Sequence, residues 1–108
     1  MEKTREAKMY CESCARPHFL SGMAYLESFR VSKDNKTLIL AEQDFIETVR
    51  RNPNDMGAQL KLADTKNLLK KYNEAKMIYK KVTRDTRYRN RALNGYLSVL
   101  KKQRGEKL

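Results

Sequence analysis

The chain has 108 residues, of which 40% are hydrophobic and 34% are charged, and its formal net charge is +11. This length favours a single domain, and this proportion of hydrophobic residues is typical of a folded chain rather than a disordered one. No run of hydrophobic residues is longer than four, which excludes a transmembrane helix and predicts no membrane insertion, and the first six residues lack the apolar segment of a secretory signal.

Helix-forming residues dominate the chain, whereas glycine and proline number only four and two. No segment alternates apolar and polar residues over the length of a strand, so we predict an all-α fold. Breaks at Pro17 and at three polar stretches, residues 32–36, 52–55 and 70–73, separate the helical segments. We expect six helices in antiparallel order, because the connections between them are short. The expected helices cover residues 2–15, 18–32, 36–51, 55–69, 72–86 and 89–103.

The first predicted helix carries the only two cysteines, Cys11 and Cys14, in a Cys-x-x-Cys spacing. His18 follows four residues later and is the only histidine, so a structural zinc ion would lack its fourth ligand. Both cysteines also fall at positions that match core residues of later helices. We therefore predict no metal and no cofactor. The sparing use of cysteine indicates a reducing, intracellular compartment, and we expect the cytoplasm.

A spacing of 34 residues relates one helix pair to the next. Alanine or arginine recurs at this spacing in three triplets: Ala7, Ala41 and Ala75; Ala24, Ala58 and Ala92; Arg16, Arg50 and Arg84. Two aromatic residues, Phe45 and Tyr79, are also 34 residues apart, each four residues after an alanine of the first triplet. An alanine lets two helices approach closely, and an aromatic side chain on the same face fills the space between neighbouring pairs. The spacing predicts an array of repeated helix pairs.

This pattern resembles the tetratricopeptide repeat (TPR) family, in which alanine at position 20 and an aromatic residue at position 24 mark the second helix of each repeat. The resemblance implies an α-solenoid of 34-residue helix-turn-helix repeats that spans residues 1–108. It places a leading helix at 1–16, full repeats at 22–55 and 56–89, and a terminal helix at 90–104.

The resemblance also implies a concave groove, lined by the first helix of each repeat, that binds a peptide or a partner helix. Family members that capture the acidic tails of chaperones use a set of lysine, asparagine and arginine residues there. Of the matching positions in this chain only Arg91 fits that set, which predicts a different protein partner. The groove positions that carry side chains suited to a partner are Met23, Leu26, Arg30, Leu60, Asp64, Asn67, Arg91, Asn94 and Ser98.

The positive charge is confined to one half of the chain. Residues 1–55 hold nine basic and nine acidic residues, whereas residues 56–108 hold fifteen basic and four acidic ones. Such an asymmetry indicates a surface for an acidic partner. That partner is a protein or, as the alternative, RNA or a ribonucleoprotein bound by residues 61–104, although no RNA-binding motif is present. The expected basic surface consists of Lys70, Lys71, Lys76, Lys80, Lys81, Arg84, Lys101 and Lys102.

The sequence contains no pattern that indicates catalysis. Its four glycines are isolated, so there is no phosphate-binding loop, and the lone histidine has no nucleophile motif beside it. We therefore expect no catalytic residues, and we expect an adaptor that forms part of a larger assembly. One preceding repeat cannot cover all of Leu93, Tyr96, Leu97 and Leu100. A partner chain, a second copy or an adjoining repeat is expected to cover one or both ends.

Overall fold

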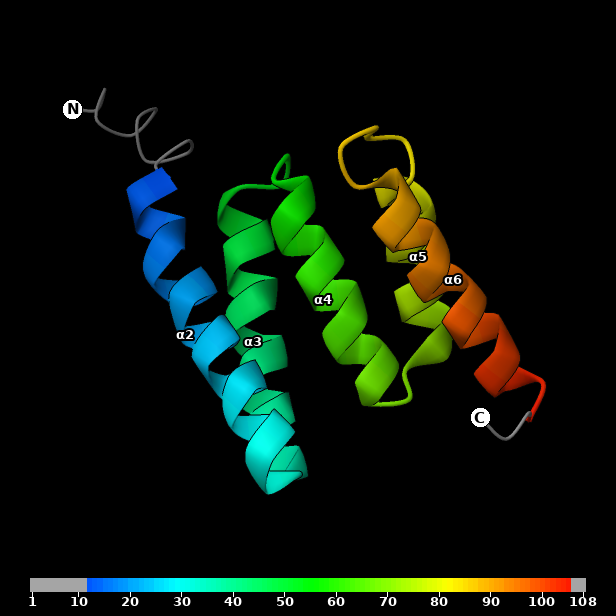
Figure 1. The fold of residues 1–108 in the computed structure, drawn as a ribbon. Helices are drawn as coiled ribbons and strands as arrows, with labels where there is room; N and C mark the ends of the chain where they lie inside the picture. Colours follow the sequence, from blue (N-terminus) through cyan, green and yellow to red (C-terminus); the bar gives the residue numbers. More distant parts are fainter. Residues whose placement is uncertain (1–11, 106–108) are drawn as a thin grey trace.

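The computed structural model describes the backbone of residues 12–105 and the side chains of residues 16–105. This part of the chain forms helices and no strand (Figure 1), which confirms the predicted all-α class. None of its helices is long and apolar enough to cross a membrane. The expected helix at 2–15 lies mostly outside the described residues. The helices are α2 (Glu12–Ser32), α3 (Asn35–Arg51), α4 (Met56–Leu68), α5 (Tyr72–Val82) and α6 (Arg89–Gln103).

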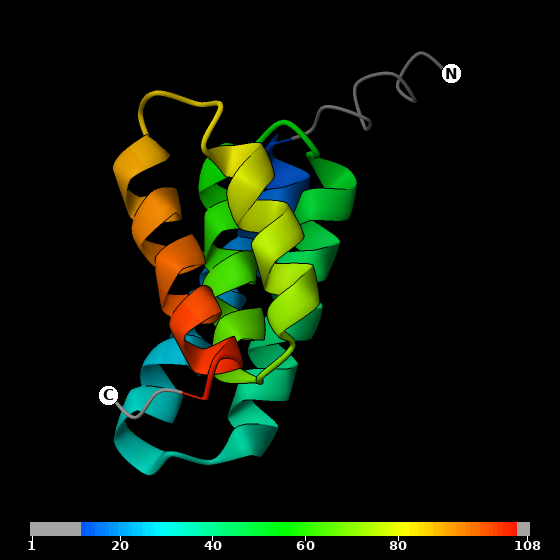
Figure 2. The ribbon, with the colours of Figure 1, turned by 90° about the vertical axis from the view of Figure 1, so that its right-hand side faces the viewer.

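Each helix packs against the next one along the chain, and successive helices run in opposite directions (Figure 1). The central helix is α4, which contacts α3, α5 and also α6. In Figure 2, α3 and α5 lie on one side of α4, and α6 lies on its other side. Helices α4 and α6, which alternate along the chain, are therefore in contact and share a surface.

An aspartate N-cap begins the helix that follows each of two predicted breaks. Asp34 precedes α3, and its Oδ1 accepts a hydrogen bond from the amide of Lys36 at 2.9 Å. Asp55 precedes α4, and its Oδ1 accepts from the amide of Ala58 at 3.0 Å. Each carboxylate satisfies an amide that has no partner within its helix. These caps fix the starts of α3 and α4 close to the predicted residues.

The predicted break at Pro17 is wrong, because α2 continues through this proline. A proline inside a helix costs about 3 kcal/mol, since it removes one hydrogen bond and crowds the preceding turn. The residues directly after it make tertiary contacts that offset this cost. Phe19 packs against Phe45 with ring centroids 5.8 Å apart, and His18 Nδ1 lies 3.4 Å from Asp44 Oδ1. These contacts hold the segment along α3.

The predicted end of the fifth helix at residue 86 is also wrong, because α5 ends at Val82. Two side chains bond to the backbone directly after that point. Thr83 Oγ1 donates to the carbonyl of Lys80 at 2.6 Å, and Asp85 Oδ1 accepts from the amide of Arg87 at 2.9 Å. Such local bonds compete with helical ones. Residues 83–88 therefore form turns that lead into α6.

The 34-residue spacing appears in the structure as equivalent buried positions. Ala41 and Phe45 of α3 pack into one hydrophobic core, and Ala75 and Tyr79 of α5 pack into the adjoining one. Ala58 and Ala92 are also equivalent and fully buried, whereas Ala24 is exposed. The pattern therefore describes the core of α3 to α6 better than that of α2. The paired residues of α3 and α5 are Ala41 and Ala75, Phe45 and Tyr79, and Thr48 and Val82, and all are buried.

The two equivalent aromatic rings each lie against a glycine of a neighbouring helix. A Cβ atom added to Gly22 in α2 would lie 2.8 Å from Phe45 Cε1. One added to Gly95 in α6 would lie 2.3 Å from Tyr79 Cζ. The hydroxyl of Tyr79 donates to Asp64 Oδ1 in α4, which holds the ring in place. The ring of Tyr79 thus sets how closely α6 packs on α5.

We predict that Gly95→Ala lowers the free energy of unfolding by about 1–3 kcal/mol, because the new methyl group overlaps a buried ring. Urea denaturation of both proteins measures this difference. The matched control is Gly57→Ala, whose Cβ would meet nothing closer than Tyr88 Oη at 3.0 Å. That contact is also tight, but Tyr88 Oη is the end of a side chain, so Gly57→Ala should cost clearly less than Gly95→Ala. A Gly95→Ala protein as stable as the control would mean that Tyr79 is not seated against α6.

Candidate functional site

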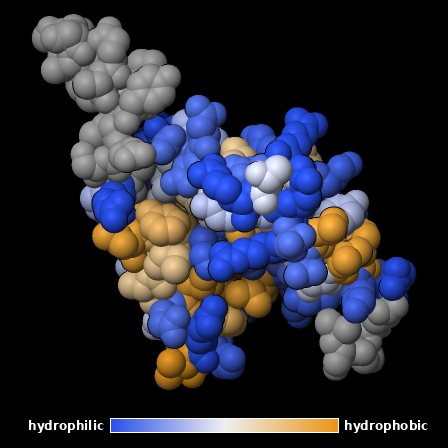
Figure 3. All heavy atoms as spheres, turned by 45° about the horizontal axis from the view of Figure 1, so that its top comes forward, coloured by the Kyte–Doolittle hydropathy of each residue, from blue (hydrophilic) through white to orange (hydrophobic). Residues whose placement is uncertain are grey.

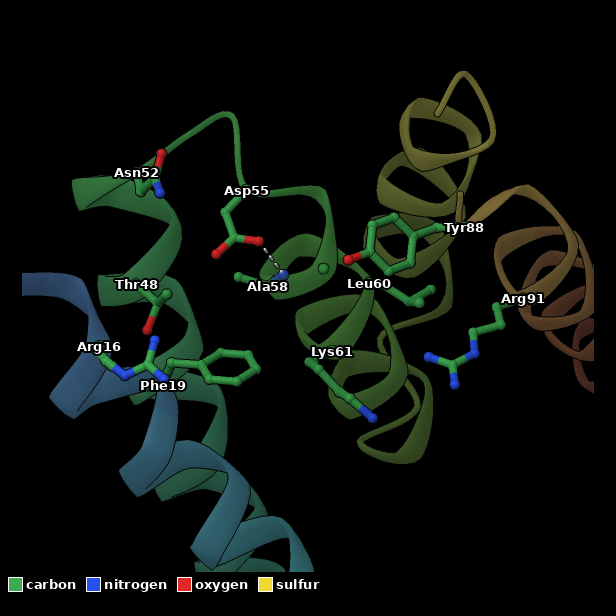
Figure 4. Close-up of a pocket in the computed structure, with 11 residues that line it drawn as sticks. Arg16, Phe19, Thr48, Asn52, Asp55, Ala58, Leu60, Lys61, Tyr88 and Arg91 are labelled. Atoms are coloured by element: carbon green, nitrogen blue, oxygen red, sulfur yellow. Dashed lines mark hydrogen bonds between the residues drawn. The ribbon is translucent and has the colours of Figure 1, made fainter. Parts of the chain in front are cut away.

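A hollow of about 370 Å³ opens between α2, α4 and α6 (Figure 4). The end of α3 and the two connections that lead into α4 and α6 complete its wall. We call it the α2–α4–α6 hollow. Its lining residues are Arg16, Phe19, Thr48, Asn52, Asp55, Gly57, Ala58, Leu60, Lys61, Tyr88 and Arg91.

Local hydrogen bonds position the wall of this hollow. The cap that Asp55 forms starts α4, so Leu60 and Lys61 follow in its second turn. Gln59 Nε2 donates to the carbonyl of Pro53 at 2.6 Å, which ties the preceding turn to the helix. On the far side, Arg89 Nε donates to the carbonyl of Thr83 at 2.9 Å. This bond braces the turn that leads through Tyr88 into α6.

Three positively charged side chains reach this hollow from three different helices. Figure 4 shows Arg16 on α2 at one side, and Lys61 on α4 and Arg91 on α6 at the other. Among the described residues, no carboxylate oxygen lies within 4.0 Å of any of the three. An unpaired cation in a half-enclosed hollow is available to an anionic ligand.

Two carboxylates lie near these cations, and both already accept hydrogen bonds. Asp55 caps α4, and Asp64 accepts from the hydroxyl of Tyr79. Burial raises the pKa of Asp64 above its ordinary value, although the bond from Tyr79 and the charges of Lys61 and Arg91 act in the opposite direction. With three cations against these two carboxylates, the hollow keeps a positive charge.

Comparison of the chain with protein-family models, with curated proteins and with solved structures gives no match. Inferences about function therefore rest on the hollow and on the surfaces around it.

Of the nine predicted groove residues, only Leu60 and Arg91 line this hollow. Leu26 and Leu60 are buried in the core, with 6% and 3% of their surface exposed, so they offer a partner little contact area. Asp64 is bonded to Tyr79, and the buried Asn67 accepts from Lys102 Nζ at 3.2 Å. The remaining four do not line the hollow: Met23, Arg30, Asn94 and Ser98.

Nine of the eleven residues that line the hollow are absent from the predicted groove set, among them Arg16, Phe19 and Lys61. Two of these three, Arg16 and Lys61, carried a signal in the sequence. Arg16 begins one of the 34-residue triplets, and Lys61 stands at a position that the TPR family uses for ligand contacts. Phe19 carried no such signal: it falls in the expected helix at 18–32, but between the leading helix at 1–16 and the first full repeat at 22–55, so no repeat position was assigned to it.

The predicted basic surface is partly used inside the fold. Lys71 Nζ lies 2.9 Å from Glu42 Oε2, and Lys102 donates a hydrogen bond to Asn67. The prediction that these two lysines belong to a free basic surface is therefore wrong. The other members form no ion pair with described residues. They are Lys70, Lys80, Lys81, Arg84 and Lys101, which are exposed, and Lys76, which is half-buried.

An ion cluster between α3, α4 and α5 is the most buried charged group in the described chain. Lys66 Nζ lies 2.8 Å from Glu42 Oε2 and 2.6 Å from Glu74 Oε1, and Lys71 also bonds to Glu42. Glu42 and Lys66 are only 5% and 8% exposed. Burial acts to raise the pKa of Glu42, but the hydrogen bonds from Lys66 and Lys71 outweigh it and hold the pKa below 4.5. The cluster joins three helices.

The Cys-x-x-Cys segment lies at the edge of the described structure. Cys11 is outside the described residues, and Cys14 belongs to α2 without a described side chain. His18 is directed at Asp44. No group of three histidine, cysteine, aspartate or glutamate residues within the described range could hold a metal ion. The absence of a zinc site at the cysteines stays a prediction.

The two ends of the row of helices expose apolar side chains. Figure 3 shows apolar atoms on the side of α2 and on the side of α6, with many hydrophilic side chains between them. On α6, Leu93 and Leu97 are 46% and 48% exposed, whereas Tyr96 and Leu100 are half-buried. The expectation that the preceding helices leave part of this stripe uncovered is confirmed for these two leucines.

Proposed function

We propose that this chain is a non-enzymatic, TPR-like adaptor that binds an acidic segment of a partner protein. The repeated core positions, the antiparallel order and the contact between α4 and α6 support a solenoid of helix pairs. The observation that carries the proposal is the α2–α4–α6 hollow, whose cations Arg16, Lys61 and Arg91 make no ion pair with described residues.

The position of the hollow supports a protein partner. In the proposed repeats, α2, α4 and α6 are the first helices, whose common surface is concave in a solenoid. A concave, half-enclosed site admits a single extended segment and removes much of its surface from water. The charge of +11 on the whole chain attracts an acidic partner from a distance.

The exposed end at α6 supports a place in a larger assembly. Leu93 and Leu97 lie one turn apart, and α6 contains four basic residues and no acidic one. A second copy that docked α6 against α6 would bring like charges together. A partner chain or an adjoining repeat with acidic residues covers this face more favourably.

The second candidate function is the binding of RNA or a ribonucleoprotein. The observation that favours it is the outer surface of α5, where Lys80, Lys81 and Arg84 are exposed and make no ion pair with described residues. Such a surface would bind phosphates without sequence specificity and with a steep dependence on salt.

Affinity capture from an extract of the source cells tests the two candidates. We expect a protein partner that stays bound after nuclease treatment and at physiological salt. The double variant Lys61→Glu/Arg91→Glu should lose that partner, because it reverses two charges in the hollow. The matched variant Lys80→Glu/Lys81→Glu, with the same change of charge, should keep it. Loss of all binding on nuclease treatment, together with loss in the α5 variant, would instead establish the RNA candidate.

A further inference from the structure

The charges in the α2–α4–α6 hollow are divided between its two sides. Arg16 stands alone on the α2 side, while Arg91 extends from α6 toward Lys61 on the opposite side (Figure 4). The hollow therefore offers two separate places for an anionic group. A single carboxylate or phosphate at one side would leave the cation at the other side unused.

Between these two places the open apolar side chain is that of Phe19. Its ring points from α2 into the space toward α4 (Figure 4), whereas Ala58 and Leu60 on α4 are 0% and 3% exposed and offer a ligand little contact area. Phe19 is half-buried, so part of its ring remains open to a ligand. An apolar side chain that covered it would gain about 25 cal/mol per Å² removed from water.

We propose that the hollow binds an extended segment of the partner protein with an acidic residue, an apolar residue and an acidic residue at alternate positions. This inference rests on the proposed function, and it names the chemistry of the segment. Alternate residues of an extended chain point to the same side and repeat at about 6.6 Å. One acidic side chain then pairs with Arg16, the apolar one covers Phe19, and the other pairs with Lys61 and Arg91.

A protein segment suits this hollow better than a nucleic acid does. Bound single strands stack their bases on open aromatic rings. Phe19 is already packed against Phe45, and the guanidinium of Arg87 lies 5.4 Å from the centre of the Tyr88 ring. The two rings of the hollow are therefore occupied on one face.

Titration with short capped peptides tests the inference, with fluorescence anisotropy at low ionic strength as the readout. The probe is Glu-Ser-Leu-Ser-Glu. Its controls are Glu-Glu-Leu-Ser-Ser with the same composition, Glu-Ser-Ser-Ser-Glu without the apolar residue, and Gln-Ser-Leu-Ser-Gln without charge. We expect the probe to bind at least about threefold more tightly than each control, within the range of exposed ion pairs and small apolar contacts.

Variants of exposed residues identify the site of binding. Arg16→Gln and Arg91→Gln should each weaken binding of the probe by about two- to fivefold. Lys80→Gln removes an equal charge on α5 and should leave the affinity unchanged. All three residues are exposed, and circular dichroism verifies that the variants are folded.

Equal affinity for the probe and for the same-composition peptide would overturn the inference. An affinity for the probe that is unchanged in both Arg16→Gln and Arg91→Gln would overturn it as well. Displacement of the probe by a single-stranded RNA with the same dependence on Arg16 would overturn it in favour of nucleic acid. If the peptides fail while Lys61→Glu/Arg91→Glu still loses a nuclease-resistant protein partner, this inference falls and the proposed function stands. If that capture fails as well, both fall.

Discussion

Glu42→Ala is expected to lower the free energy of unfolding by about 3–5 kcal/mol, because it removes the buried anion that neutralises Lys66. The lysine is 8% exposed and would keep only Glu74, whose side chain is 59% exposed. Lys71, which is exposed, would lose its partner at little cost. Urea denaturation at neutral pH measures the loss.

Glu74→Ala is the matched control, since it removes a carboxylate from the same lysine but leaves the buried pair intact. Its effect should stay below about 1 kcal/mol, as for exposed ion pairs. The double variant Glu42→Leu/Lys66→Met replaces both charges and should recover most of the stability. Equal effects of Glu42→Ala and Glu74→Ala would contradict the buried cluster.

The same cluster makes the difference between wild type and Glu42→Ala depend on pH. The pKa of Glu42 in the folded chain lies below its ordinary value of 4.5. A carboxyl group with a lowered pKa contributes its full stability above the unfolded pKa and loses it as the pH falls through the folded one. The two proteins should therefore differ most above about pH 5 and converge in more acidic solution.

Tyr79→Ala is expected to cost about 3–5 kcal/mol, because it removes the largest fully buried side chain and leaves a cavity between α4, α5 and α6. A domain of this size has a total stability of about 5–15 kcal/mol, so this variant should unfold at much lower urea concentrations.

Two further variants show how much of this stability loss comes from the hydroxyl of Tyr79 and how much from the buried position of its ring. Tyr79→Phe keeps the ring against Gly95 and loses only the bond to Asp64, at a cost of about 1 kcal/mol. Tyr72→Ala removes a half-buried tyrosine from the same helix and should cost clearly less than Tyr79→Ala. Similar losses for Tyr72→Ala and Tyr79→Ala would contradict the central role of Tyr79.

The sequence predicted the core of this fold better than the ends of its helices. The core pairs Ala41 and Ala75, and Phe45 and Tyr79, could be predicted from their spacing. In paired helices, small and aromatic residues that recur at a fixed interval lie where the helices pack against each other. Pro17 and the end of α5 could not, since tertiary contacts of Phe19 and side-chain bonds of Thr83 and Asp85 decide them.

The candidate site was less accessible to prediction because it depends on where three helices lie relative to one another. Arg91 and Leu60 were found from repeat positions, but the repeat pattern gives no measure of burial and placed the buried Leu60 among open groove residues. The basic surface was misjudged for a similar reason. Lys71 and Lys102 pair with residues 29 and 35 positions away, which no local pattern reveals.

The most direct test of the account is to locate an acidic ligand on the folded chain by the amide chemical shifts of the labelled protein. On addition of the peptide Glu-Ser-Leu-Ser-Glu, we predict that the shifts concentrate in residues 16–19, 57–61 and 88–91, which line the α2–α4–α6 hollow. Shifts confined to residues 76–84 on α5, with none in the hollow, would contradict the account.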